Sequence, residues 1–91
     1  MLTLIIYDIT EDDVRSKVAD FLRGKGLKRI QKSAFIGDLS SSQKRDIEAG
    51  LRQLVKGVRA NVQIFPLTPA SYNMRTVIGV ELHYDDGGYV L

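Results

Sequence analysis

Apolar residues dominate the beginning of the chain. Residues 2–9 consist mostly of leucine and isoleucine, with one carboxylate, Asp8, near the far end. So few polar positions predict a strand that lies in the middle of its sheet. Thr10 is placed to cap a helix that follows, and Asp13 three residues later makes a pair that resembles a capping box.

Two helices are predicted from apolar residues at the spacing i, i+4, i+7 and i+8. The first stripe consists of Val14, Val18, Phe21 and Leu22. The second stripe, in a helix from about Ser42 to Lys56, consists of Ile47, Leu51, Leu54 and Val55. Gly24 and Gly26 are expected to end the first helix, and Gly57 the second.

Three later stretches have the composition of strands. Residues 28–37 alternate between polar and apolar side chains and predict a second strand. A third is expected over residues 60–65, closed by Pro66 because proline cannot donate a hydrogen bond to the ladder. A fourth is expected from Arg75 to about Leu82, and residues 89–91 form a short apolar tail.

We interpret the chain as one α+β domain over residues 1–91, with the order β-α-β-β-α-β and a C-terminal strand or tail. This is the split βαβ arrangement, a four-stranded antiparallel sheet with both helices on one face. The other face of the sheet would stay open, although the strands carry apolar residues on both sides. A second copy together with the tail is the simplest cover, which predicts a homodimer.

Composition narrows the functional classes. The chain has 91 residues and no cysteine, which excludes a disulfide framework, a cysteine zinc site and a cysteine nucleophile. No apolar run approaches the ~20 residues that span a bilayer, so no membrane association is expected. Residues 1–10 lack the basic start of a signal peptide, and a cytoplasmic protein is therefore predicted.

Positive charge is concentrated between Arg15 and Lys32, where seven basic residues stand against the single acidic residue Asp20. Such a block suits a polyanionic partner, above all a phosphate backbone. The alternative is a solvated helix face whose acidic start, residues 11–13, matches the helix dipole. Neither a phosphate-binding loop nor a G-x-G-x-x-G motif is present.

Asp8 is the strongest candidate for chemistry, because it lies where a predicted central strand meets a loop that opens a helix. It could accept hydrogen bonds from the amides of residues 10–12 as a turn carboxylate. Alternatively, it could hold Mg²⁺, which binds one or two carboxylates together with waters and phosphate oxygens. A two-fold dimer would supply a second Asp8 to such a site.

Other candidates surround this carboxylate in the sequence. Tyr7 and Phe35 are either half-buried core aromatics or platforms on which a base stacks. Arg15 and Lys17 belong to the first turns of the predicted helix, and Arg29 begins the second strand. Each of these three is either solvated or a phosphate contact.

Four stretches together resemble a known family. They are "YDI" at 7–9, "RSKVADFL" at 15–22, "GLKRIQKSAFIGDL" at 26–39 and "VIG" at 77–79. The chain resembles the small CRISPR-associated protein that accompanies the integrase in spacer acquisition, also described as a CRISPR-associated endoribonuclease. The resemblance extends over essentially the whole chain.

The resemblance implies a ferredoxin-like homodimer in which the two Asp8 residues face each other and bind Mg²⁺. It implies either a nuclease acting on RNA or DNA or a non-catalytic scaffold on which the integrase holds DNA. The tail would pair with the partner's sheet. Asp8 and Tyr7 are assigned to catalysis, and nucleic-acid binding is assigned to Arg15, Lys17, Arg29 and Phe35. Lys17, often arginine in the family, keeps the charge but loses bidentate geometry.

Overall fold

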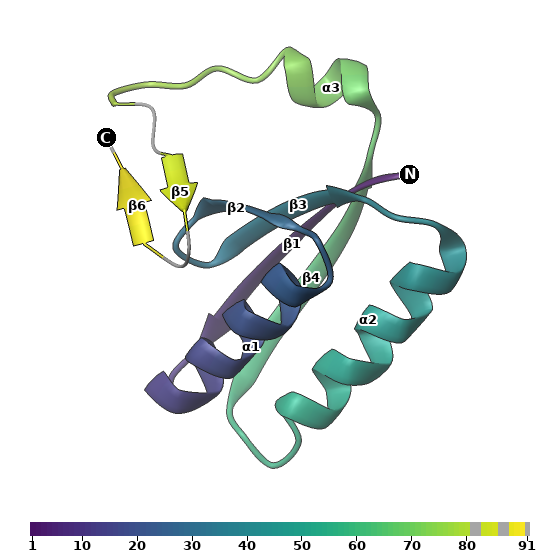
Figure 1. The fold of residues 1–91 in the computed structure, drawn as a ribbon, viewed down its shortest axis with the longest axis vertical. Coiled ribbons are helices and arrows are strands. Elements are labelled where there is room, and N and C mark those ends of the chain that lie inside the picture. The colour runs from purple at the N-terminus through teal and green to yellow at the C-terminus, as the bar shows by residue number, and fades with distance from the viewer. Residues whose placement is uncertain (81–82, 86–87, 91) are drawn as a thin grey trace.

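A four-stranded antiparallel sheet lies at the centre of the protein (Figure 1). The computed structural model describes residues 1–80, 83–85 and 88–90. The strands, in the spatial order β2-β3-β1-β4, are β2 (Lys28–Gln31), β3 (Ala34–Asp38), β1 (Leu2–Ile9) and β4 (Ala60–Leu67). The helices α1 (Asp12–Gly24) and α2 (Ser41–Leu54) cover one face. The ferredoxin-like βαββαβ prediction is confirmed.

The core lies between the helices and this face of the sheet. Alternate residues of β1 point into it, so that Ile5 and Tyr7 are buried while Ile6 and Asp8 belong to the opposite face. The apolar stripes of both helices meet these strand residues, as the sequence predicts. The helices approach closely at Gly50, where an added Cβ would lie 2.3 Å from the ring of Phe21.

Residues 28–37 are two strands and not the single strand that was predicted. A turn at residues 32–33 separates β2 from β3, and the two strands pair antiparallel with an irregular register between Arg29 and Gln31. The turn carries no Asn-Gly or Asp-Gly signal, so the alternation of side chains runs through it unmarked. This hairpin provides the two middle strands that the βαββαβ order requires.

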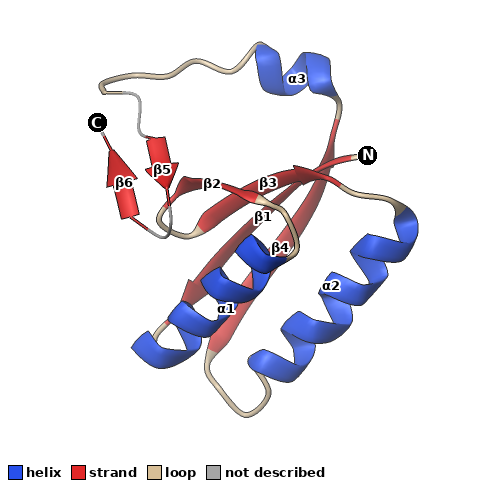
Figure 2. Ribbon diagram, viewed as in Figure 1, coloured by secondary structure: helices blue, strands red, loops and turns tan. Residues whose placement is uncertain are grey.

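The C-terminal third departs from the predicted pattern. The strand expected over residues 75–82 is absent from residues 75–80, and 81–82 lie outside the described residues, as does Leu91 of the predicted tail. Instead α3 (Pro69–Asn73) follows β4, and β5 (His83–Asp85) pairs with β6 (Gly88–Val90) beside β2 (Figure 2). Strand β4 also continues through Pro66, which an edge strand tolerates.

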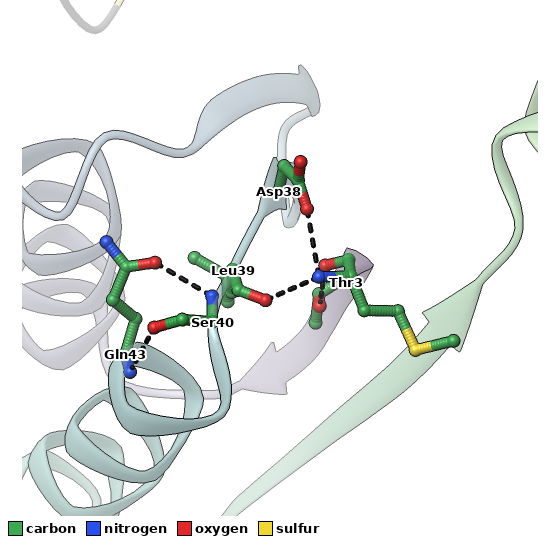
Figure 3. Close-up of polar contacts among 6 residues, drawn as sticks. Thr3, Asp38, Leu39, Ser40 and Gln43 are labelled. Atoms are coloured by element: carbon green, nitrogen blue, oxygen red, sulfur yellow. Dashed lines mark hydrogen bonds and ion pairs between the residues drawn. The ribbon is translucent and has the colours of Figure 1, made fainter.

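The ends of the elements are fixed by local hydrogen bonds, but only in part as predicted. Ser40 caps α2 in a full capping box with Gln43 (Figure 3). Close by, the amino group of Met1 lies 2.9 Å from the carboxylate of Asp38 and ties the start of β1 to the end of β3. At α1 the predicted cap is wrong, since Glu11 and not Thr10 precedes the helix, without a side-chain hydrogen bond.

Among the described residues, no helix is long and apolar enough to cross a membrane.

Candidate functional site

Asp8 lies near the end of β1, on the face of the sheet that the helices leave open. Its side chain is exposed, whereas its neighbours Tyr7 and Ile9 are buried on the helix face. Within the described residues, its carboxylate has no hydrogen bond and no ion pair. The alternative interpretation of Asp8 as a turn carboxylate is therefore wrong, and both oxygens are available to a ligand.

Amide side chains from β4 lie next to this carboxylate. Strand β4 runs antiparallel to β1 in a register that pairs Asp8 with Asn61 and Ile6 with Gln63. Both amides are exposed, and the Nε2 of Gln63 donates a hydrogen bond of 3.0 Å to the Oδ1 of Asn61. The end of the open face thus presents a carboxylate and a connected pair of amides.

These groups fit a hard divalent cation only in part. Carboxylate and amide oxygens are the ligands that Mg²⁺ prefers. However, the described part of the chain contains no cluster of three acidic, histidine or cysteine side chains, and Asp8 is the only one of these residue types placed here. One protomer therefore offers half of a site, which waters, phosphate oxygens or a second protomer would have to complete.

Tyr7 belongs to a different group of residues. Its ring stacks on that of Phe35 with centroids 6.3 Å apart, and its hydroxyl donates to the carbonyl of Lys32 at 3.4 Å. The guanidinium of Arg29 lies over the Phe35 ring, 5.3 Å from its centroid. The Nε of Arg29 donates to the same Lys32 carbonyl at 3.2 Å. Together these three side chains hold the β2–β3 turn, and we call them the turn clamp.

Burial determines what the turn clamp can do. Phe35 is 0% exposed and Tyr7 is 6% exposed, so neither ring offers a face on which a base could stack. Burial also raises the pKa of the Tyr7 hydroxyl, although the neighbouring Arg29 acts in the opposite direction. The phenol therefore stays protonated at neutral pH and is not a general base there.

Within one protomer, the two predicted catalytic residues are consequently not brought together. Tyr7 and Asp8 are adjacent in the chain, but consecutive residues of a strand point to opposite faces. Tyr7, Arg29 and Phe35 do meet, on the helix side of the sheet. Asp8 stands apart from them on the open face.

Arg15 connects α1 to the end of β1. Its guanidinium donates to the carbonyls of Ile9 at 3.1 Å and Thr10 at 3.3 Å, and it pairs with the carboxylate of Asp12. The charge is thus held at the end of the strand that carries Asp8, but it is partly balanced. Lys17, two residues further along the helix, is exposed and remains free for a phosphate within the described residues.

Three polar residues near Asp8 were not predicted as candidate site residues from the sequence. Asn61 and Gln63 alternate with apolar residues in β4, which was predicted as a strand without any candidate functional residue. Arg59 directly precedes β4, close to the Ile9–Ala60 pair. The signal that would have identified them is the β1–β4 register, which hydropathy alone does not supply.

Fold and site define a class, a small ferredoxin-like protein with a carboxylate on the uncovered face of its sheet. The family model described as CRISPR associated protein Cas2 matches residues 1–75. A CRISPR-associated endoribonuclease Cas2 of Korarchaeum cryptofilum is 42% identical over 76 residues, which cover 84% of this chain and 82% of that protein. The chain belongs to the Cas2 family.

Two further similarities are informative. A CRISPR-associated endonuclease Cas1/endonuclease Cas2 fusion of Thermoproteus tenax is 46% identical over 65 residues, covering 71% of this chain and 25% of that protein. The crystal structure of Streptococcus pyogenes Cas2 superposes with a TM-score of 0.76 at 20% identity, covering 87% of this chain and all of that one. The latter match supports the fold.

Proposed function

We propose that this protein is a metal-dependent nuclease of CRISPR adaptation that acts as a homodimer, with the two Asp8 carboxylates binding Mg²⁺. The observation that carries the proposal is the carboxylate of Asp8, which is exposed on the open face of the sheet and has no partner within the described residues. Relatives such as the Korarchaeum cryptofilum protein are named endoribonucleases, which supports a nuclease in general.

The apolar character of the open face favours the dimer. The side chains that share this face with Asp8 and remain partly exposed include Leu2, Leu4, Ile6, Phe65 and Leu67. Covering them with a second copy would remove apolar surface from water on both protomers. The exposed apolar residues Val77, Ile78 and Val80 could pair with the free edge of a partner's β4, as the resemblance implies for the tail.

Each group has a role in the proposed reaction. Asp8 from both protomers would hold the cation, which when bound polarises a phosphodiester and promotes attack by water. Lys17 and the partly balanced Arg15 would orient the phosphate backbone from the adjacent helix. The turn clamp would act indirectly, by keeping β2 and β3 in place beside β1.

A second function is favoured by a separate observation. The Thermoproteus tenax relative is named as a fusion of the endonucleases Cas1 and Cas2. In this chain a non-catalytic dimer could hold DNA for the CRISPR integrase through the basic stretch between Arg15 and Lys32. The two functions differ in whether Asp8 is needed.

The test is the Asp8→Asn variant, measured for Mg²⁺-dependent cleavage of RNA and duplex DNA and for spacer acquisition with the integrase. Asp46→Asn serves as the control, because Asp46 is an exposed carboxylate on α2. Loss of an ion ligand should lower cleavage by at least about 10- to 100-fold, the range found for groups around a metal. Undiminished cleavage refutes the metal site, whereas lost cleavage with normal acquisition makes the scaffold the biological role.

A further inference from the structure

Two amide side chains next to Asp8 have no role in the function proposed so far. We propose that Asn61 contributes a second oxygen ligand to the Asp8 cation site and that Gln63 orients it. This inference rests on the proposed function, because it adds residues to the same site. It converts the half-site of each protomer from one protein ligand to two.

The strand register places the side chains of Asp8 and Asn61 close together. Asp8 and Asn61 are directly opposite each other in neighbouring antiparallel strands, and both side chains are exposed on the same face. Residues opposite each other have Cβ atoms ~4.5–5.5 Å apart. Oxygens carried by two such side chains can reach one cation whose ligands lie at ~2.0–2.1 Å.

Gln63 fixes the orientation of the Asn61 amide. The Nε2 of Gln63 donates 3.0 Å to the Oδ1 of Asn61, which holds the amide in one of its two orientations. An amide oxygen has two lone pairs, so one remains for the cation while the other accepts this hydrogen bond. The amide is therefore preorganised, and less rotamer freedom is lost on binding.

The chemistry explains why an amide suits this position. In a two-fold dimer the two Asp8 carboxylates would already repel each other, and a third and fourth charge would increase that repulsion. An amide adds a hard oxygen donor without adding charge. The described residues include no cluster of three acidic, histidine or cysteine side chains that would serve instead.

The inference is tested by titrating the dimer with Mn²⁺, an oxygen-seeking probe for a magnesium site, and following free Mn²⁺ by electron paramagnetic resonance. Asn61→Ala should weaken binding by about tenfold, in the range seen when groups around a metal are removed. Gln63→Ala should weaken it by only about two- to tenfold, the effect of one hydrogen bond. Asn61→Asp keeps an oxygen ligand at this position and should bind more tightly than Asn61→Ala.

The matched control is Asn73→Ala, since Asn73 is exposed in α3, beyond the other end of β4. Its Mn²⁺ affinity should equal that of wild type. If Asn61→Ala binds like wild type while Asp8→Asn does not bind, this inference is overturned and the proposed function survives. If wild type and Asp8→Asn bind equally, the proposed function itself fails.

Discussion

Tyr7 and Asp8 are neighbours in the chain, yet their side chains belong to two regions with different surroundings. The helix face at Tyr7 is closed by stacking, hydrogen bonds and burial among Tyr7, Phe35 and Arg29. The open face at Asp8 carries a carboxylate with no partner in the described residues and two exposed amides. One strand thus gives its alternate residues to the buried core and to the open face.

The family resemblance assigns residues of both regions to nuclease activity, but their different burial predicts different effects of substitution. Substitutions of Tyr7 and Phe35 in the turn clamp should act mainly on the fold, because these two side chains have little surface to offer a substrate. Substitutions at Asp8 should act on binding and leave the fold intact.

Phe35→Ala should produce the largest loss of stability. The ring is 0% exposed between β3 and the helices, so its removal leaves a cavity and should lower the free energy of unfolding by about 3–5 kcal/mol. Urea denaturation measures this. A change near zero would mean that the ring is not part of the core and would favour base stacking by Phe35.

Ile6→Glu probes the open face. Ile6 is partly exposed next to Gln63, and dimerisation would bury it; burying an isoleucine contributes about 1.5–3 kcal/mol. We expect the charged variant to be a folded monomer in sedimentation equilibrium. Lys17→Glu, an exposed change on α1, should stay dimeric. An Ile6→Glu dimer as tight as wild type would show that the open face is not the interface.

Tyr7→Phe should have the smallest effect, about 0.5–1.5 kcal/mol for one hydrogen bond. The free energy of unfolding of this variant should also depend on pH differently from that of wild type. Because burial raises the folded-state pKa of Tyr7 above the unfolded value of 10.0, the hydroxyl's contribution is complete below pH 10 and declines as the pH rises toward the folded-state pKa. The variant should lack this part of the alkaline decline; equal slopes in both proteins would contradict the assignment.

Much of the fold could be predicted because hydropathy periods reflect burial directly. The stripe through Val18 and Leu22 and the apolar run of β1 identified their elements. The β2–β3 turn escaped prediction because residues 32–33 carry no glycine or asparagine, and the clamp that holds it consists of tertiary contacts. The expected strand over residues 75–82 shows that β-favouring composition alone does not create a partner strand.

The candidate site was predicted only at Asp8. Alternation along β1 could have separated Tyr7 from Asp8, but which face is covered depends on the helices. Asn61 could not be placed beside Asp8 from the sequence, because a shift of one residue in the β1–β4 register would turn the amide toward the core. Sites assembled across strands need the register as well as the residues.

The most direct measurement of the division between the two faces is thermal unfolding with and without Mg²⁺ for wild type, Asp8→Asn and Tyr7→Phe. A ligand at several times its Kd stabilises the folded state by about 1 kcal/mol. For a domain of this size, that raises the midpoint by about 4–8 °C. We predict this rise in wild type and Tyr7→Phe and none in Asp8→Asn. An equal rise in Asp8→Asn, or its loss in Tyr7→Phe, would contradict the separation of the two faces.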